Sequence, residues 1–423
     1  MKTTYFFKIF NNIKSEHEPK DFAKIELEGL FGEVKPICNF MDYITKKPLK
    51  VFTSKEIRIQ DILAFELPYG KIQGYYSEKE ELGEITNLVK RLAYTREILL
   101  IVEKYKEPKE LLKEIFKDGN IGKNVHFYEK DNLVLFRFIT NQFFLEKSQY
   151  VSKLSRFEKE IDANVSTLFS HLIENTKRIP SSSTLAIGKK LEDWFAIREE
   201  PSLYLNHYMH DYKGKFHPKM TRALVNYVYP KENGVILDNF AGCGTALVEG
   251  NYLGLDSLGV EINPLSVLMC NVKCNSVNIP IANLKQEIEN FMDNLEKEVS
   301  FSKSLQDGQQ LLLSSSIDQA KLKEFVVKTK INLQERMKTN VADNTIRDVF
   351  VARELLKSIA DENIHDFLLL SISGAISDGL RRSKATFVEI LQSRLSDLYR
   401  RLYLYHKLNE VLKIKKKKAK CYI

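Results

Sequence analysis

Residues that interrupt globular structure are few, since the 423-residue chain has only 18 glycines and 11 prolines. This scarcity excludes collagen-like and Pro/Gly-rich disordered chains. Long apolar runs are missing too, because the best one, at residues 367–376, is far shorter than the about 20 residues that cross a bilayer. Lys8 interrupts the candidate secretory core at the N-terminus. We therefore expect a cytoplasmic protein of two or three domains with no membrane partner.

Cysteine is also scarce, and the five residues are scattered: Cys38, Cys243, Cys270, Cys274 and Cys421. Cys270 and Cys274 have C-x3-C spacing and could supply two zinc ligands. Zinc needs four converging ligands, and no second His or Cys pair lies near them in the sequence. A histidine cluster beside Asp211 lies on irregular chain: His207, His210 and His217. We therefore expect reduced thiols and no metal site.

Positive charge is concentrated at one end of the chain. The net charge is +8, and removing the six lysines of residues 413–420 would lower it to +2. Such a run binds phosphates by displacing counterions, or it is a solvated chain end, and both interpretations stay open. The same two interpretations apply to basic residues that are interleaved with acids further upstream: Arg381, Arg382, Lys384, Arg394, Arg400 and Arg401.

Hydrophobic patterning divides the chain into four parts. Residues 1–150 predict an α+β accessory domain, with strands at 5–10, 34–40, 57–67, 98–102, 125–128 and 133–139 and helices at 80–94 and 108–116. Residues 151–184 predict a connecting helix and a Pro/Ser linker, and residues 185–280 an α/β half-domain. Residues 281–423 predict helices at 282–297, 317–328, 345–360, 364–380 and 387–414, with a break at 300–304 and a basic tail. No strand is predicted after Ile262, and Trp194 with Phe195 either anchors the linker or stacks on a base.

The chemistry-bearing segment is residues 234–264. An apolar strand at 235–237 leads through Asp238 to a turn with Gly242 and Gly244, then to a helix that Thr245 opens, and to a second strand that carries Glu261. Glycine lets the backbone approach a ligand where a Cβ would clash. A carboxylate at the tip of the second strand suits the two hydroxyls of a ribose. These residues therefore predict a nucleotide-type site at the carboxyl edge of a parallel sheet.

Two ligands compete for this site. A dinucleotide fold uses G-x-G-x-x-G to hold a pyrophosphate, whereas this turn reads G-x-G-T. Asp238, four residues before the first glycine, would repel a pyrophosphate and suits the ammonium group of S-adenosylmethionine. We favour S-adenosylmethionine over NAD, with a ligand-free strand–helix–strand unit as the structural alternative.

The motif resembles a known family. Asp238-x-Phe-Ala-Gly-x-Gly-Thr, followed by Gly-x-Glu261-Ile-Asn-Pro, is similar to the methyl-donor motif of amino-type DNA methyltransferases, which methylate cytosine N4 or adenine N6. Residues 212–218, with a predicted helix at 219–228, resemble the segment that lines the donor's methionine end in that family. Residues 368–382 resemble helices inserted after its donor-binding half. The resemblance covers roughly residues 178–400 and departs at Asn239, where the family usually has proline.

The resemblance implies a fold, a reaction and a set of residues. The fold is a partial Rossmann-like, S-adenosylmethionine-dependent methyltransferase core of α/β class, with an N-terminal α+β domain and a helical C-terminal region. The donor-binding residues implied are Phe216, His217, Asp238, Phe240, Gly242, Gly244, Thr245, Glu261 and Asn263. The cofactor is S-adenosyl-L-methionine and the partner is DNA. The amine attacks directly, so no cysteine needs to act as a nucleophile.

A second resemblance favours another polymer. Residues 5–7, 88–95 and 218–226 are similar to archaeal-type tRNA guanine-N2 methyltransferases, whose THUMP-bearing N-terminal region holds tRNA. Both families methylate an exocyclic amine of a base, so they imply the same reaction, with tRNA as the alternative substrate. A non-catalytic nucleic-acid-binding subunit that keeps the donor pocket only structurally is the alternative from another class.

Both families also carry an Asp/Asn/Ser-Pro-Pro-aromatic tetrapeptide, which binds the target amine and stacks on the extruded base. It is missing here, and the nearest string, Glu66-Leu67-Pro68-Tyr69, has the wrong first residue and lacks the first proline. We therefore expect the catalytic residues on a second polypeptide that also completes the sheet. A truncated reading frame or an inactive relative is the alternative.

Overall fold

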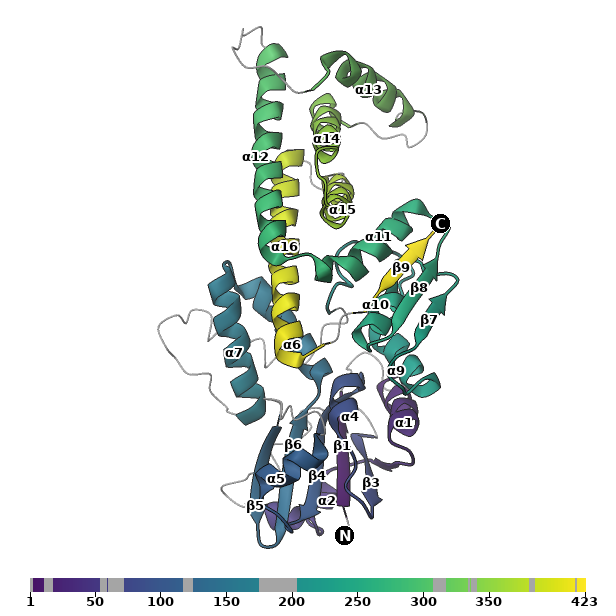
Figure 1. The fold of residues 1–423 in the computed structure, drawn as a ribbon, viewed down its shortest axis with the longest axis vertical. Coiled ribbons are helices and arrows are strands. Elements are labelled where there is room, and N and C mark those ends of the chain that lie inside the picture. Colours follow the sequence, from purple (N-terminus) through teal and green to yellow (C-terminus); the bar gives the residue numbers. More distant parts are fainter. Residues whose placement is uncertain are drawn as a thin grey trace.

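A computed structural model of the chain describes residues 3–10, 18–53, 59, 72–116, 125–174, 204–306, 317–333, 335, 341–379, 385–414 and 417–423. These residues form an elongated, mixed α/β molecule (Figure 1). An antiparallel sheet lies at one end, a group of long helices at the other, and a small parallel sheet beside them. The predicted strand at 57–67, the linker with Trp194 and Phe195, and the string 66–69 lie outside the described residues, apart from Ile59.

The N-terminal sheet has six strands in the order β2-β3-β1-β4-β6-β5, and every neighbouring pair is antiparallel. Side chains of β1 alternate between two hydrophobic clusters, with Tyr5 and Phe7 on one face and Phe6 on the other. The predicted α+β class of this part is confirmed. The strands are β1 (Thr3–Ile9), β2 (Lys35–Ile37), β3 (Gly74–Lys79), β4 (Thr95–Glu103), β5 (Val125–Lys130) and β6 (Leu133–Ile139).

Helices cover this sheet, and four elements of the N-terminal part were not predicted: α1 (Glu18–Leu30), β3, α2 (Met41–Ile44) and the 3-10 helix at Leu49–Phe52. The helix α1 and the strand β3 carry many charged residues, which hide their apolar pattern. The predicted helix at 80–94 is confirmed only for α4. The helices here are α1 (Glu18–Leu30), α2 (Met41–Ile44), α4 (Thr86–Arg91) and α5 (Pro108–Ile115), with a 3-10 helix at Leu49–Phe52.

The predicted connecting helix is in fact two helices, α6 (Asn141–Leu154) and α7 (Glu158–Glu174). The first helix ends at Ser155, whose backbone is extended. Polar as well as apolar side chains of α6 are buried, because α6 packs between α7, α4 and the long C-terminal helix α16 (Phe387–Leu412). The helix α6 therefore belongs to the core rather than to a linker.

The five helices predicted in the C-terminal part are confirmed: α12 (Ile281–Gln306), α13 (Gln319–Asn332), α14 (Asp343–Leu356), α15 (Glu362–Gly379) and α16. The predicted break at 300–304 is wrong, because α12 continues through it. The helices α12 and α16 lie side by side along the long axis (Figure 1). Across the described ranges, no helix has the length and apolar content needed to cross a membrane.

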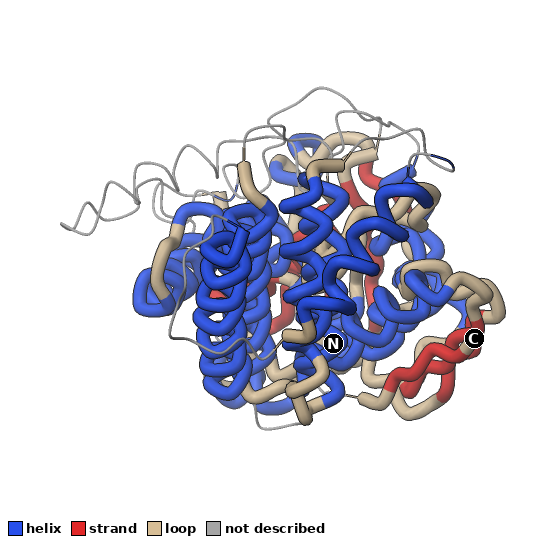
Figure 2. The backbone as a smooth tube through the Cα atoms, turned by 90° about the horizontal axis from the view of Figure 1, so that it is seen from above, coloured by secondary structure: helices blue, strands red, loops and turns tan. Residues whose placement is uncertain are grey.

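The small sheet has three parallel strands in the order β7-β8-β9: β7 (Val235–Asp238), β8 (Asp256–Val260) and β9 (Ala419–Tyr422). Figure 2 shows these strands at the edge of the molecule, with helices on one side of them. Those helices include α10 (Thr245–Tyr252) and α11 (Pro264–Asn275), which is followed by a 3-10 helix at Ser276–Asn278. The helix α9 (Pro218–Val228) packs on α10 and on α1.

The strand β9 corrects the prediction that no strand follows Ile262. Ala419 and Cys421 are buried, whereas Lys420 and Tyr422 are exposed, so β9 has the alternation of a half-buried strand. The amide N–H groups of Lys417 and Lys418 donate to the side chains of Asn251 and Asp256, at 2.7 and 3.1 Å. The end of the basic run is therefore folded rather than a solvated tail. Lysines masked the strand pattern in the sequence.

Candidate functional site

Two carboxylates meet at the carboxyl edge of the parallel sheet. Asp238 ends β7 and lies opposite Gly259 of β8, and Glu261 follows β8 directly. The Oδ1 atom of Asp238 accepts a hydrogen bond from the amide of Phe240, at 3.1 Å. Glu261 accepts from the amide of Gly242 at 2.9 Å and from that of Asn263 at 3.0 Å. Each carboxylate thus organises the turn after its own strand, and Glu261 also ties the two turns together.

A cavity of about 470 Å³ opens over these carboxylates. This volume lies within the range of about 300–1,000 Å³ that is typical of small-molecule sites. One wall comes from the loop before α9 and from α9 itself, and the other from the turn after β7 and the first turn of α10. The lining residues are Tyr212, Gly214, Lys215, Phe216, Met220, Thr221, Leu224, Val225, Asp238, Phe240, Ala241, Gly242, Cys243, Thr245, Ala246 and Glu261.

Most of the residues expected to hold a ligand line this one cavity: Phe216, Asp238, Phe240, Gly242, Thr245 and Glu261. Three others do not line it. His217 is the residue before α9, and the Asn263 side chain caps α11 by accepting from the amide of Leu265. Gly244 packs against α11 instead. Tyr212, Lys215 and Thr221 line the cavity but were not singled out, although all three lie in the segment 212–228 that carries the resemblance.

The two turn glycines have different reasons to be glycine. Both have positive φ, +50° at Gly242 and +80° at Gly244, a region that residues with a Cβ rarely occupy. A Cβ at Gly244 would lie 2.5 Å from the Sγ of Cys270, so close packing of α10 on α11 requires glycine there. A Cβ at Gly242 would meet the Tyr212 hydroxyl at 3.4 Å, on the wall of the cavity. Of these two glycines, only Gly242 lines the cavity, and positive φ rather than lack of space is what favours glycine there.

Two lysines add positive charge beneath the turn. The Nζ atom of the buried Lys273 donates to the carbonyl of Cys243 at 3.0 Å, and that of Lys215 donates to the carbonyl of His207. Burial, together with the nearby charge of Lys273, lowers the pKa of Lys215 to about 8. The cavity thus presents carboxylates on one side and a partly desolvated ammonium on the other.

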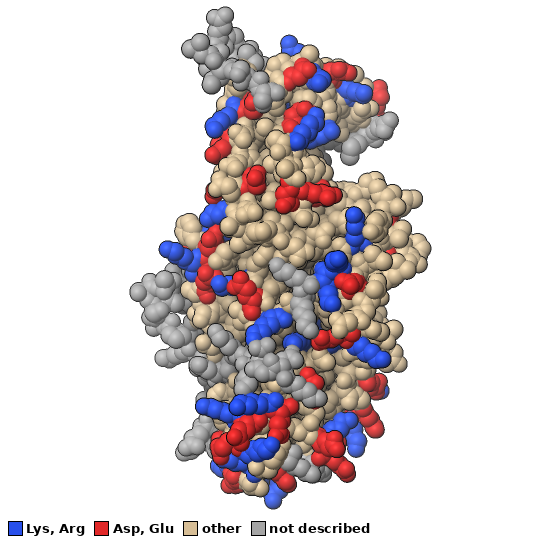
Figure 3. Space-filling view, viewed as in Figure 1, with Lys and Arg blue, Asp and Glu red and all other residues tan. Residues whose placement is uncertain are grey.

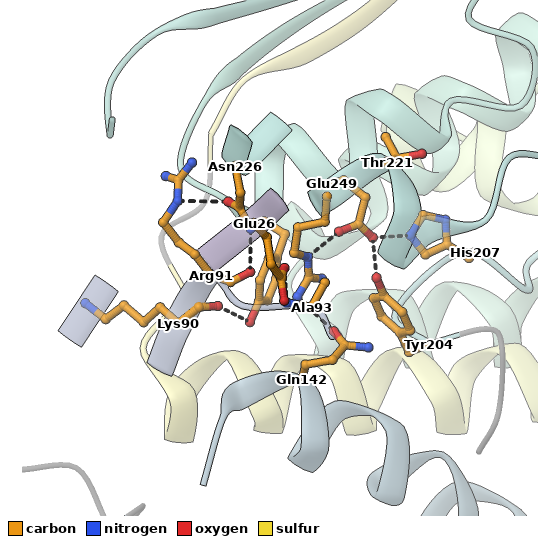
Figure 4. A network of polar contacts seen from close by, with 12 residues as sticks. Glu26, Lys90, Arg91, Ala93, Gln142, Tyr204, His207, Thr221, Asn226 and Glu249 are labelled. Carbon is orange, nitrogen blue, oxygen red and sulfur yellow. Dashed lines mark hydrogen bonds and ion pairs between the residues drawn. The ribbon is translucent and has the colours of Figure 1, made fainter. Parts of the chain in front are cut away.

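A buried network of charges holds the walls of the cavity (Figure 4). Glu249 of α10 accepts hydrogen bonds from Arg222 of α9 at 2.5 Å, from the Tyr204 hydroxyl at 3.0 Å and from the Nε2 atom of His207 at 2.7 Å. The side chains of Arg222, His207 and Glu249 are fully buried. Burial opposes ionisation of Glu249, but the charge of Arg222 and the bond from His207 outweigh it and hold the pKa of Glu249 below its ordinary value.

The same network joins the cavity to the N-terminal part. Arg222 donates to the side chain of Gln142 in α6 at 2.8 Å, and Asn226 exchanges hydrogen bonds with Arg91 at the end of α4. A Cβ at Gly29 of α1 would lie 2.7 Å from the Cα of Tyr227, so α1 and α9 pack backbone to backbone. The accessory part is therefore continuous with the wall of the site rather than a separate body.

The buried His207 predicts a loss of stability in acid. Burial lowers the pKa of His207 to about 4 from its ordinary 6.5, so the unfolded chain binds a proton that the folded chain excludes between these values. As the pH falls from about 6.5 to about 4, this group is expected to cost about 3 kcal/mol of folding free energy. The measurement is urea unfolding over this pH range for the wild type and for His207→Gln, which keeps a hydrogen-bond donor.

The comparison with His207→Gln is needed because Glu26 titrates with the opposite sign. Burial raises the pKa of Glu26 to about 7, although the amides of Ala93 and Tyr94 donate to its carboxylate. Its stabilising contribution is therefore lost as the pH rises toward 7. Subtracting the two pH profiles removes this common part. Parallel profiles for wild type and His207→Gln would contradict the assignment of the acid effect to His207.

The remaining polar candidates are used within the fold. Arg394 bonds Asp378 and the carbonyl of Met209, and Arg400 and Arg401 bond Asp397, whereas Arg381, Arg382 and Lys384 lie outside the described residues. The His210 ring bonds the Asp211 carbonyl. In the part of the chain that the structure describes, no three His, Cys, Asp or Glu side chains are grouped so as to hold a metal ion.

The chain was compared with protein-family models and with curated proteins. Neither comparison finds a match to it.

Proposed function

We propose that this chain is the donor-binding part of an S-adenosylmethionine-dependent methyltransferase that acts on an exocyclic amine of a base in DNA, cytosine N4 or adenine N6. The observation that carries the proposal is the opening of Asp238, Glu261 and Lys215 onto one cavity of ligand size. In this proposal β7, β8 and β9 belong to a Rossmann-like core, whose ligands bind at the carboxyl ends of parallel strands.

The charges around the cavity fit the two ends of the donor. S-adenosylmethionine has a zwitterionic methionine end and a ribose with two hydroxyls. In the proposed arrangement the carboxylate of Asp238 binds the ammonium group, Lys215 faces the donor carboxylate, and Glu261 accepts from the ribose hydroxyls. Glu261 can do so while it accepts the amides of Gly242 and Asn263, because a carboxylate has about four lone-pair sites. A pyrophosphate, by contrast, would meet two carboxylates.

The reaction sets the requirement for a partner. The bound donor supplies a methyl group on a sulfonium sulfur, and its transfer to the amine nitrogen releases S-adenosylhomocysteine and a proton. A hydrogen-bond acceptor must therefore hold the amine, and an aromatic ring must stack on the nucleobase that carries it. Both are roles of the Asp/Asn/Ser-Pro-Pro-aromatic tetrapeptide. The sequence lacks this tetrapeptide. We propose that a second polypeptide carries it.

Calorimetric titration of the 423-residue chain tests donor binding. S-adenosylmethionine is expected to bind the wild type, and Asp238→Ala is expected to weaken it at least tenfold, because a charge-assisted hydrogen bond contributes about 1.5–3 kcal/mol. Asp42→Ala, at an exposed carboxylate far from the cavity, is the matched control and should bind like the wild type. Tighter binding of NAD than of S-adenosylmethionine would contradict the proposal. No binding by either protein would favour a non-catalytic subunit.

A gel-shift comparison tests the polymer. Duplex DNA is expected to be retarded at lower protein concentration than tRNA of equal phosphate content at the same salt concentration, since nucleic-acid affinity depends strongly on salt. The opposite order would replace DNA by tRNA as the substrate.

A further inference from the structure

One face of the parallel sheet carries apolar side chains that nothing in the described chain covers. Alternation sends Ile236 and Ser257 toward α10, where a Cβ on Gly250 would touch both of them. The opposite face presents Val235, Leu237, Leu258 and Val260, which are 65%, 63%, 42% and 44% exposed. Parallel sheets are normally covered on both faces. This bare face, defined by those four side chains, therefore lacks the covering layer that a parallel sheet normally has.

The outer edge of β7 also lacks a neighbouring strand among the described residues. Among the described strands, β7 pairs only with β8, so the main-chain groups on its other side have no ladder partner. An apolar strand with an open edge favours the addition of another strand. Phe240 and Ile262, which follow β7 and β8, are 90% and 88% exposed, so apolar surface continues from the bare face to the mouth of the cavity.

The handedness of chain crossovers indicates what covers this surface. The crossover from β7 through α10 to β8 places α10 on one face of the sheet. Crossovers between parallel strands are right-handed, so a strand–helix unit that extends the sheet in the other direction, beyond β7, places its helix on the opposite face. That face is the bare one. A single strand–helix unit therefore satisfies both the open edge and the apolar surface.

We propose that the β7 edge and the bare face are the docking surface for a second polypeptide, which adds a parallel strand beside β7 and packs a helix on Val235, Leu237, Leu258 and Val260. The identification of this polypeptide as the one with the catalytic tetrapeptide rests on the proposed function. Its strand would end beside Asp238, at the point where the strand order reverses and ligands of open α/β sheets bind. The docked partner would thus bring its residues to the donor cavity.

A second copy of this chain fits the surface less well. Two copies related by a two-fold axis would pair β7 with β7 in antiparallel fashion and would supply no helix for the bare face. Charge does not oppose a protein partner either, because Figure 3 shows mostly uncharged side chains on the visible face of the lobe that holds β7, β8 and β9. An apolar protein surface fits this lobe better than a polyanion does.

The test uses the 423-residue chain and a defined probe: the neighbouring-gene polypeptide that carries the tetrapeptide after an apolar strand, co-expressed and purified with it. Light scattering is expected to give a 1:1 complex, and hydrogen exchange of the β7 amides that do not bond to β8 is expected to slow at least tenfold on binding. The double variant Val235→Lys/Leu258→Lys should weaken the complex at least 100-fold, because it places two charges in an apolar interface. Val327→Lys, at a similarly exposed valine of α13, is the control and should bind normally.

The double variant should fold normally, because both side chains are exposed in the chain alone, and equal melting temperatures check this. The proposal would be overturned by a complex that the double variant does not weaken, by a dimer of this chain that protects β7, or by a genome that encodes no such polypeptide. Donor titration of the same samples separates the two proposals. Docking with no donor binding would remove the proposed donor site and leave the docking surface. Donor binding with no docking would remove this inference, together with the proposed second polypeptide, and leave the donor site.

Discussion

Replacing Glu261 by alanine is expected to weaken the binding of S-adenosylmethionine by more than 100-fold. In the proposed arrangement the carboxylate accepts both ribose hydroxyls, and two charge-assisted hydrogen bonds at about 1.5–3 kcal/mol each correspond to at least this factor. Glu261 also accepts the amides of Gly242 and Asn263, so its loss loosens both turns that border the cavity. The measurement is calorimetric titration of the donor into the two proteins.

Glu261→Gln separates the two effects. Gly242 and Asn263 donate to different oxygens of Glu261, so the glutamine side chain keeps an acceptor for only one of these amides and loses the charge. We therefore expect a donor affinity and a melting temperature that lie between those of the wild type and of Glu261→Ala. The interpretation would be wrong if Glu261→Gln bound the donor as the wild type does. The same titration with adenosine alone reports the ribose contribution without the methionine end, and it should show a similar loss.

Replacing Glu249 by alanine is expected to destabilise the protein by about 3–5 kcal/mol, because it leaves the guanidinium of Arg222 buried without its partner. It also removes the acceptor of the Tyr204 hydroxyl and of the His207 ring. The network links α9 and α10 to α6, so both walls of the cavity should loosen together with the contact to the N-terminal part. Urea unfolding with a two-state check measures this effect.

A surface pair gives the matched control. Glu354 bonds Lys357 at the end of α14, where Lys357 is exposed and Glu354 is half-buried, so Glu354→Ala should cost less than about 1 kcal/mol. The double variant Glu249→Ala/Arg222→Met should be more stable than Glu249→Ala alone, because it removes the unpaired charge as well. Equal losses for Glu249→Ala and Glu354→Ala would contradict the role of the buried network.

The network also explains why the N-terminal part and the cavity belong together. Arg222 lies between Glu249 in α10 and Gln142 in α6, and the Tyr252 hydroxyl donates to the carbonyl of Lys90 at 3.0 Å. A buried charge with partners from both parts makes their separation costly, since separation would break the buried hydrogen bond between Arg222 and Gln142. A fragment that begins after residue 203 would therefore lack partners that its own α9 needs.

Local sequence patterns were enough to predict the segment that carries the candidate site. The apolar run of β7, the acid that ends it, the glycine turn and the helix α10 lie within 18 residues of one another, and each follows from local rules of alternation and turn chemistry. The lining of the cavity by Asp238, Gly242, Thr245 and Glu261 was predicted for this reason. The helices α12 to α16 were likewise predicted from their periodicity.

Features that depend on contacts between distant segments could not be predicted from these local patterns. The strand β9 lies about 160 residues after β8, and its lysines look like a solvated tail until α16 returns the chain to the sheet. The packing of Gly244 on Cys270, the position of Lys215 at the cavity, and the pairing of Arg222 with Glu249 depend in the same way on neighbours from separate elements. Alternation and turn chemistry act over a few residues, whereas burial and charge pairing arise only when distant segments are packed together.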